Sequence, residues 1–470
     1  MTDANIPTDA NVPTDANVPT DANVRTDGQP GGRPRLSVTI PVFNNGHLLA
    51  MALDALTRQS MPRDEFEVIL VDDGSEPSLE PVVAPFTGTL PLTYLRHSPN
   101  RGRSVARNRA IAEARGDVVL LLDADHCAHP DLLRRHWEFH AARGLRPGVL
   151  LGRSIVVDWA AIDALKQGRN PEPPMLGDYR EDVRDYLFAS PHRRRDFARA
   201  PWVYAHTNNA SVDRATLLAV GGFDENLVTW GGEDNELFYR LFHHHGRDPD
   251  LFAIGDDAIT YDLPHFRSWR VLMAQLAENV KHIARKHPRY DIEFFGFPGL
   301  WSNAVRRIAW FEDALDASRA HGLGRVDQLP TAYQRELAGK NCLLIGHGAS
   351  KLDLGPDSVT FDHDAPAGAG NLHLAGLLTP FEDARFSRVV SVDLWRFLTP
   401  EDLGGFLEEA MRLAGRVDFV CTDLGIPPTA MLPLPFVSDL AFLRTTVEPY
   451  LLVGQTSAGG CEILTIAGTR

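Results

Sequence analysis

The sequence predicts an α/β protein with two domains, each built on a mostly parallel sheet. Two observations support this prediction. Short β-branched runs alternate with amphipathic segments, as in RLSVTIPVF (35–43), HLLAMALDALTRQS (47–60) and EFEVILVDD (65–73), and a second alternation begins near residue 340. Such alternation implies right-handed strand–helix–strand crossovers in a doubly wound sheet. The 470 residues also exceed the length that one hydrophobic core usually supports.

The N-terminal segment repeats a six-residue unit, TDANIP, TDANVP, TDANVP and TDANVR, over residues 2–25. Each unit offers one aliphatic side chain, which cannot offset the entropy lost on ordering the backbone. GQPGGRP (28–34) then has the composition of a linker. We therefore expect residues 1–33 to form a disordered tail and linker.

The first predicted domain covers residues 34–268. After the elements named above, VARNRAIAEARG (105–116) has helical spacing and DVVLLLDAD (117–125) reads as a strand. Ligands of doubly wound sheets gather at the carboxyl ends of the strands, where VDDGS and LLDAD both place acidic residues. Residues 269–335 are expected to form a helical extension, and residues 336–470 a second domain.

Composition excludes several classes of protein. The formal charge of -15 argues against a nucleic-acid-binding protein, which needs a basic face. No apolar run approaches the ~20 residues needed to span a bilayer, and the N-terminus lacks the pattern of a secretory signal. The four cysteines show no CxxC pairing. We interpret them as buried thiols of a cytoplasmic protein.

The first acidic cluster follows the strand that ends before Asp123. Alternate residues of an extended chain face the same way, so Asp123 and Asp125 can point at one site. Their hard oxygen ligands suit Mg²⁺ or Mn²⁺, with diphosphate oxygens completing the shell. A polar turn is the alternative for an isolated DxD sequence. Asp72 and Asp73 at a neighbouring strand end favour a nucleotide site, because carboxylates there can accept from ribose hydroxyls or a base N–H.

The second acidic cluster is Glu233–Asp234 in WGGEDNELFYRL. Gly231 and Gly232 let the backbone approach a sugar closely and adopt strained torsions. The two carboxylates then occupy the first turn of a helix, whose dipole favours negative charge. This environment suits a general base, which must stay ionised. Helix capping is the alternative, since Asp and Glu are common at helix starts.

The segments SVTIPVFNN, ALDALTRQS, FEVILVDDGS and NRGRSVARNRAIAEARGDVVLLLDAD, taken together in this order, resemble glycosyltransferase family 2, whose members are inverting enzymes with a GT-A fold. The resemblance covers residues 36–266. It implies a donor site in which Asp73 contacts the nucleoside, Arg107 lies near the nucleotide and Asp125 binds the metal directly. Asp123 would reach the ribose or a metal-bound water, and Pro41 completes this site. For Arg107 alone, a solvated helix charge is the competing interpretation.

The GGFDENLVTWGGEDNELFYRL segment is especially similar to the acceptor motif of β-1,4-galactosyltransferases. This similarity implies that Asp234 is the base, that Glu233 binds the acceptor hydroxyl and that Trp230 is an apolar platform for a sugar ring; core packing is the alternative for Trp230. His265 in YDLPHFR stands where related enzymes supply a further metal ligand. Many relatives carry another histidine where this chain has Asp262, so the third ligand stays open.

The implied activity is metal-dependent transfer of a sugar, with inversion, from a nucleotide-sugar donor to an acceptor hydroxyl. UDP-sugars are the family's commonest donors, and the galactosyltransferase-like motif favours galactose or N-acetylgalactosamine weakly. The acceptor is a saccharide, a peptide or a small molecule. A non-catalytic sugar-nucleotide-fold module is one alternative. A bifunctional enzyme that also transfers methyl groups is another.

The C-terminal segments NCLLIGHGASKLDLG and VTFDHDAP resemble class I S-adenosylmethionine-dependent methyltransferases, with a Rossmann-like fold over residues 336–470. The resemblance implies a cofactor turn at Gly346 and Gly348, with Asp362 or Asp364 at the ribose. The chain departs from the family's pattern at two positions, Leu344 and Ser350, where an acidic residue and a glycine are usual. A degenerate Rossmann-like partner module is therefore the favoured interpretation.

Overall fold

A computed structural model describes residues 24–25, 32–144, 146–171, 191–296, 301–422, 434, 436–438 and 440–469. Its contacts divide the chain into two compact units. The first unit comprises Met1–Asp178, Thr207–Val228 and Ile254–Pro264, and the second comprises Tyr179–His206, Thr229–Ala253 and His265–Arg470. The units interleave along the chain, whereas the sequence predicted consecutive parts at 34–268, 269–335 and 336–470.

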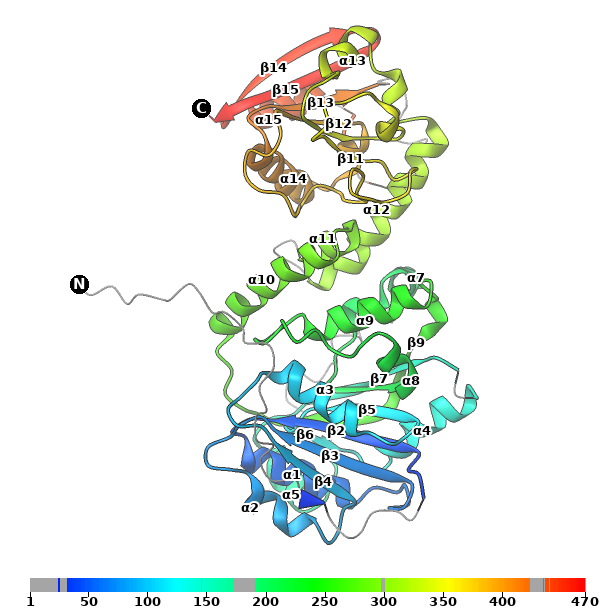
Figure 1. Ribbon diagram of the computed structural model, residues 1–470, viewed down its shortest axis with the longest axis vertical. Coiled ribbons are helices and arrows are strands. Elements are labelled where there is room, and N and C mark those ends of the chain that lie inside the picture. The colour runs from blue at the N-terminus through cyan, green and yellow to red at the C-terminus, as the bar shows by residue number, and fades with distance from the viewer. Residues whose placement is uncertain are drawn as a thin grey trace, which may run out of the picture. The chain divides into compact units, whose positions relative to one another are not determined.

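The centre of the first unit is a set of parallel strands (Figure 1). These are β2 (Leu36–Val42), β3 (Phe66–Asp72), β4 (Leu92–Arg96) and β5 (Val118–Leu122). Almost all of their residues are buried, as expected where helices cover both faces of a sheet. Because the strands run the same way, the residues that follow β2, β3 and β5 lie along one edge.

Further strands extend this sheet on both sides. They are β1 (Val24–Arg25), β6 (His126–Ala128), β7 (Val149–Val156), β8 (Asn209–Asp213) and β9 (Phe252–Asp262). β8 is antiparallel to β5 and β7, β6 to β9, and β1 to β4. The strand order is β1-β4-β3-β2-β5-β8-β7-β9-β6. β1 belongs to the last repeat of the predicted tail, so these two tail residues are paired.

Helices of the first unit form where the sequence shows apolar spacing. α1 (Gly46–Thr57) buries Leu49, Leu53 and Leu56 completely. Asp213 caps the start of α8 (Arg214–Ala219), because its carboxylate accepts a hydrogen bond of 2.9 Å from the Thr216 N–H. The others are α2 (Glu80–Val83), α3 (Arg103–Glu113), α4 (Leu132–Ala142) and α5 (Ala161–Lys166).

The second unit contains a group of helices and a second sheet. α10 shows why the helices cluster: it buries Leu276, Val280 and Ile283 at helical spacing and exposes its other face. The helices before the second sheet are α7 (Pro191–Arg199), α9 (Glu233–His244), α10 (Trp269–Lys286), α11 (Tyr290–Gly296), α12 (Trp301–His321) and α13 (Thr331–Leu337).

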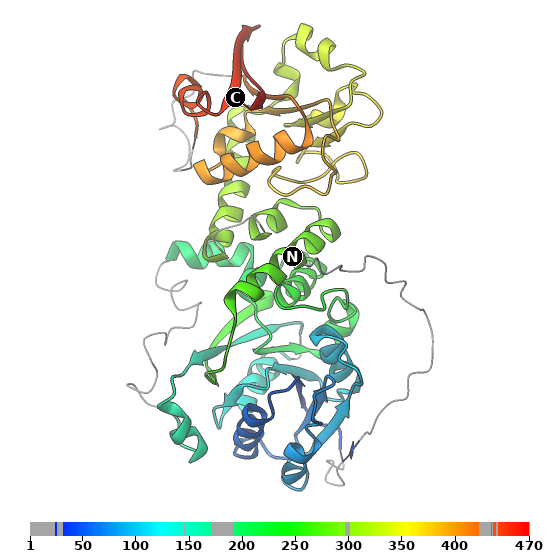
Figure 2. The same cartoon turned by 90° about the vertical axis from the view of Figure 1, so that its left-hand side faces the viewer.

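The second sheet has parallel strands β10 (Cys342–Ile345), β11 (Val359–Phe361), β12 (Arg388–Val392) and β13 (Val417–Cys421). The hairpin of β14 (Leu451–Ala458) and β15 (Cys461–Thr469) joins it antiparallel through β15, giving the order β11-β10-β12-β13-β15-β14. α14 (Pro400–Leu413) packs on β12 and β13, and α15 (Leu440–Val447) contacts β14 (Figure 2). The predicted fold class, a GT-A domain and a second Rossmann-like α/β domain, is confirmed.

A buried carboxylate ties α11 to the second sheet. Glu293 accepts hydrogen bonds from four successive backbone N–H groups, those of residues 375–378, at 2.5–3.1 Å. Burial raises the pKa of Glu293 to about 7, although the four N–H groups favour its charged form. The helical segment is therefore joined by a specific polar contact to the loop between β11 and β12 of the second sheet.

The four cysteines are free and buried, as expected from the sequence. None of the helices in the described part of the chain combines the length and apolar character needed to cross a lipid bilayer.

Candidate active site

The carboxyl ends of β2 and β3 lie side by side, because Val42 pairs with Asp72 in the parallel register. Asp72 is fully buried. Its Oδ1 accepts from the Ser75 N–H at 2.8 Å, and its Oδ2 accepts from Tyr94 Oη at 2.7 Å and from the Leu79 N–H at 3.2 Å. Both oxygens are hydrogen-bonded within the protein, by the loop after β3 and by Tyr94 of β4, and the contact of Asp72 with the donor stays a prediction.

Asp73 shapes the loop that leads into α3. Its carboxylate lies 2.7 Å from His97 Nδ1 and accepts from the backbone N–H groups of Arg101 and Gly102 at 3.0 and 2.8 Å. The side chain is buried, and half-buried Pro41 lies on the adjacent strand β2. Asp73 is thus at the predicted edge of the sheet, and its contact with a nucleoside stays a prediction.

Arg107 lies on α3 and reaches the first acidic cluster. Its Nη2 donates to Asp123 Oδ1 at 3.0 Å, and its guanidinium lies 5.2 Å from the ring centroid of Phe223. Only 3% of Arg107 is exposed. The interpretation of Arg107 as a solvated helix charge is therefore wrong. The side chain of Asp123 remains one-third exposed, so it can still contact a ligand.

Asp123, Asp125 and His126 offer ligand atoms that lie within 4.8 Å of one another. Pairing of β6 with β9 brings Asp262 opposite His126, and Asp262 and Asp125 also lie within that distance. Burial lowers the pKa of His126, but its hydrogen bond to Asp125 and the nearby charges of Asp262 and Asp123 raise it to about 9. The first unit thus gathers three carboxylates, while both ring nitrogens of His126 are already engaged, Nδ1 with Asp125 Oδ1 at 2.9 Å and Nε2 with Ser154 Oγ at 3.0 Å.

This group fits a divalent cation, because several carboxylate oxygens converge at the edge where a diphosphate is expected. His126 and Asp262 were not predicted as members of it. Adjacency to the DAD sequence was a signal for His126. The predicted ligand His265 follows Asp262 by three residues, so their Cα atoms lie no more than about 11 Å apart. Ligation by His265 stays a prediction.

The WGGED segment starts α9 and packs on α10. Gly231 and Gly232 have φ values of 101° and 85°, which favour glycine. A Cβ at Gly231 would lie 3.0 Å from Leu276, and one at Gly232 would lie 2.9 Å from Ile283. These side chains belong to α10. The glycines therefore permit close helix packing, a role that the sequence did not predict, and their approach to an acceptor stays a prediction.

The two adjacent carboxylates of this segment have different surroundings. Glu233 is buried, and its Oε2 accepts from the Gly231 N–H at 2.9 Å. This bond lies in the turn before α9 and is not a helix cap, because the N-cap residue is Gly232 and the Gly231 N–H is outside the helix. Asp234 is half-buried and lies in the first turn of α9. Trp230 is also half-buried, and its ring lies edge-on to Trp269 with 6.4 Å between centroids.

Glu236 anchors α9 to the end of α10 and was missed by the sequence analysis. Fully buried, it accepts from Arg240 at 2.7 Å and lies 2.8 Å from Lys286 Nζ and 2.9 Å from His287 Nε2. Burial raises its pKa, but hydrogen bonds from His287, Arg240 and Lys286 outweigh that effect and lower the pKa to about 2. The first turns of α9 are therefore held in place by a buried ion cluster.

Replacing Glu236 by Gln should lower the free energy of unfolding by about 3 kcal/mol at neutral pH. The folded-state pKa lies below the ordinary value of 4.5, so this stabilisation is present above that pH and is lost as the pH falls toward 2. Urea titrations near pH 7 and near pH 3 measure the difference from the wild type. Exposed Asp250 supplies the control Asp250→Asn. A difference that does not shrink in acid would contradict the expectation.

The Gly-rich turn after β10 is covered by the protein itself. The His347 N–H donates to the Gly324 carbonyl at 2.7 Å, and the Val326 N–H donates to the His347 carbonyl at 3.0 Å. A Cβ built on Gly346 would lie 2.9 Å from the Gly324 oxygen. The predicted cofactor turn at Gly346 is therefore closed by residues 323–326.

The two acidic residues after β11, Asp362 and Asp364, have different surroundings. Asp362 is buried and accepts from Ser350 Oγ at 2.7 Å and from the N–H groups of Ser350 and Gly348 at 3.1 and 3.2 Å. Its oxygens have little remaining capacity to accept hydrogen bonds from the hydroxyls of a ribose. Gly348 and Asp364 line a cavity instead. With Gly346 covered and Asp362 occupied, these residues do not fit the predicted binding of S-adenosylmethionine.

Comparisons with known proteins agree with the first unit's architecture. Residues 37–148 match the family model described as glycosyl transferase family 2, and residues 204–259 match the one described as the N-terminal domain of galactosyltransferase. The first match contains β2 to β5 and the DAD sequence, and the second contains WGGED. The chain is a glycosyltransferase whose residues 37–148 are similar to glycosyl transferase family 2.

Relatives of this chain include the validoxylamine A glucosyltransferase of Streptomyces hygroscopicus subsp. jinggangensis, which is 28% identical over 421 residues, 82% of this chain and 96% of the relative. The chondroitin synthase of Escherichia coli is 29% identical over 242 residues, 48% of this chain and 34% of the synthase. Among solved structures, the mannosyltransferase PcManGT from Pyrobaculum calidifontis in complex with GDP-Man and Mn²⁺ has a TM-score of 0.39 and 21% identity, covering 57% of this chain and 67% of its own.

Proposed function

We propose that this protein transfers a sugar from a UDP-sugar to an acceptor hydroxyl with inversion, in a reaction that requires Mn²⁺ or Mg²⁺. The observation that carries the proposal is the convergence of Asp123, Asp125, His126 and Asp262 at the carboxyl edge of the first sheet. A carboxylate-rich group at this position is suited to a cation and a diphosphate. A binding module without catalysis would not need such a group.

On the donor side, Asp125 and Asp262 would hold the cation, with His265 as a further ligand. The bound cation would neutralise negative charge on the departing diphosphate. Arg107 holds Asp123 by an ion pair of 3.0 Å, so the Asp123 carboxylate is positioned before any donor binds. Asp73 fixes the loop that starts α3 and would contact the nucleoside beside Pro41.

On the acceptor side, we assign Asp234 as the general base. It would accept the proton of the acceptor hydroxyl while that oxygen attacks the anomeric carbon from the face opposite the diphosphate. The Glu233 carboxylate accepts a hydrogen bond from the Gly231 N–H, so it orients the WGGED segment. It would contact the acceptor only through a second lone pair. Trp230 would cover one face of the acceptor sugar.

Chain connectivity limits how far Asp234 can lie from the donor loop. Ser104 Oγ donates to the Leu227 carbonyl at 2.9 Å, and Gly102, whose N–H donates to Asp73, lies against Val228. The chain therefore leaves the donor loop, which contains Gly102 and is bound by Asp73, at Val228. Asp234 follows six residues later, so it lies within about 22 Å of that point along the chain.

The donor sugar is the open part of the proposal. The relative that covers 82% of this chain is named a glucosyltransferase, which favours UDP-glucose over the galactose suggested by the WGGED motif. Release of UDP should be measured with UDP-glucose, UDP-galactose and UDP-N-acetylgalactosamine, each with Mn²⁺ or Mg²⁺. We expect one donor to be preferred, with release abolished by a chelator and restored by excess cation. Chelator-resistant release would contradict the proposed metal dependence.

A further inference from the structure

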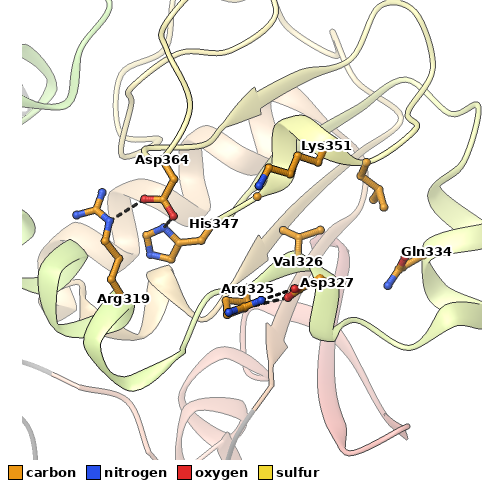
Figure 3. A pocket seen from close by; sticks show the side chains of 10 residues that line it. Arg319, Arg325, Val326, Asp327, Gln334, His347, Lys351 and Asp364 are labelled. Carbon is orange, nitrogen blue, oxygen red and sulfur yellow. Dashed lines mark hydrogen bonds and ion pairs between the residues drawn. The ribbon is translucent and has the colours of Figure 1, made fainter.

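The second unit contains a cavity of about 460 Å³ outside both segments that match the glycosyltransferase families (Figure 3). It lies between the end of α12, the segment that follows it and the turn after β10. Its volume is that of a small-molecule site. The side chains that define its chemistry are Arg319, Arg325, Gln334, His347, Lys351 and Asp364.

The cavity carries an excess of positive charge in a strongly acidic protein. Arg319 pairs with Asp364, and Arg325 pairs with Asp327, which also lines the cavity. The Lys351 side chain is exposed and makes no hydrogen bond or ion pair in the part of the chain that the structure describes. Lys351 and Arg325 reach the cavity from opposite sides (Figure 3). An anionic group between them would gain charge-assisted hydrogen bonds.

His347 presents an acceptor to the same cavity. It is 5% exposed, and its Nε2 lies 2.7 Å from Ser318 Oγ. Because Ser318 Oγ donates to the Leu315 carbonyl at 2.8 Å, it accepts from Nε2–H. Burial lowers the pKa of His347, which favours the neutral ring with a lone pair on Nδ1. This Nδ1 lies 3.0 Å from Asp364 Oδ2, so the two groups form an ion pair only when the ring is protonated and are both acceptors when it is neutral.

Two acceptors that face each other at this distance are satisfied by hydroxyl donors. Neighbouring hydroxyls of a sugar can donate one hydrogen bond to a carboxylate and one to an imidazole nitrogen. Arg319 Nε donates to the other oxygen of Asp364 at 2.7 Å, so the carboxylate is held in place. A cation excess on one side and two acceptors on the other define the ligand chemistry.

We propose that this cavity binds a phosphorylated sugar, with the phosphate held by Lys351 and Arg325 and the hydroxyls by His347 and Asp364. The ligand is a free sugar phosphate or the ribose phosphate of a nucleotide, which share this chemistry. Such a site is separate from the donor site of the first unit and gives the enzyme a second place to sense or hold a sugar derivative.

Calorimetry on the full chain tests the proposal with glucose 1-phosphate, adenosine 5′-monophosphate, inorganic phosphate and glucose. We expect saturable binding of one or both phosphorylated sugars, weakened about tenfold or more by Lys351→Gln and by Asp364→Asn. Lys340→Gln changes an exposed lysine outside the cavity and should leave affinity unchanged. The two phosphorylated probes distinguish a free sugar phosphate from a nucleotide.

Asp125→Asn separates this site from the donor site, since binding at the cavity should survive that substitution whether or not the proposed transfer reaction is correct. Absence of saturable binding would overturn the proposal. So would binding that both cavity variants leave unchanged, or inorganic phosphate binding as tightly as the sugar phosphates. Binding of S-adenosylmethionine at the cavity, lost in Lys351→Gln, would replace the proposed ligand by the cofactor.

Discussion

Asp234→Asn is expected to reduce sugar transfer by about a thousandfold while UDP affinity stays within about twofold of the wild type. The substitution keeps the size of the side chain and removes its ability to accept a proton at neutral pH. Asp234 is half-buried at the first turn of α9, so the fold tolerates the amide. Single-turnover transfer with saturating donor measures the loss, and calorimetry measures UDP binding.

The same variant separates catalysis from helix capping. Asn and Asp are both accepted at helix starts, so a residue that only stabilised α9 would leave transfer nearly unchanged in Asp234→Asn. Asp250→Asn is the matched control, because Asp250 is exposed and lies after α9. Glu233→Gln should lower stability through its bond to the Gly231 N–H. Full transfer activity in Asp234→Asn would remove the assigned base.

The parallel part of the first sheet was predictable because its signals are local. β2, β3 and β5 are buried on both faces, and such strands are nearly continuous apolar runs in the sequence. Parallel strands end at one edge, so acidic residues after β3 and β5 were placed together before any coordinates. The prediction of Asp125 in a carboxylate group depended on this rule and on the alternation that lets Asp123 and Asp125 face one site.

The rest of the donor group depends on pairing between distant segments. Asp262 lies opposite His126 only because β9 joins the sheet beside β6, and no local pattern specifies that neighbour. Asp72 and Asp73 show the opposite problem. They are adjacent in sequence, yet Asp72 is bonded to Tyr94 and the loop after β3, whereas Asp73 contacts His97 and the loop before α3. Neither motif specifies these tertiary partners.

Glycines of the second unit also have tertiary neighbours that the sequence did not specify. Gly231 and Gly232 were interpreted as room for a sugar, whereas Leu276 and Ile283 of α10 fill the space above them. Gly346 was interpreted as a cofactor turn, and the carbonyl of Gly324 lies there. A glycine reports that something comes close to the backbone. Sequence alone does not say whether it is a ligand or the protein's own chain.

Asp125→Asn is expected to weaken cation-dependent UDP binding by about ten- to a hundredfold and to reduce transfer by at least as much. An amide oxygen keeps the shape of one carboxylate oxygen but loses the negative charge that attracts the cation. Asp125 belongs to both sets of neighbouring ligand atoms. Its carboxylate lies within 4.8 Å of ligand atoms of Asp123 and His126, and also within 4.8 Å of a carboxylate oxygen of Asp262. Removing its charge therefore affects every arrangement of ligands that the first unit offers.

The decisive comparison is UDP affinity with Mn²⁺ against UDP affinity with a chelator. In the wild type these should differ strongly, and in Asp125→Asn they should converge because the cation no longer links protein to diphosphate. Asp64→Asn, at an exposed position of the same unit, controls for the loss of one negative charge. Unchanged Mn²⁺-dependent affinity in Asp125→Asn would contradict the metal assignment while leaving the base assignment intact, because Asp234 is tested by transfer at saturating donor.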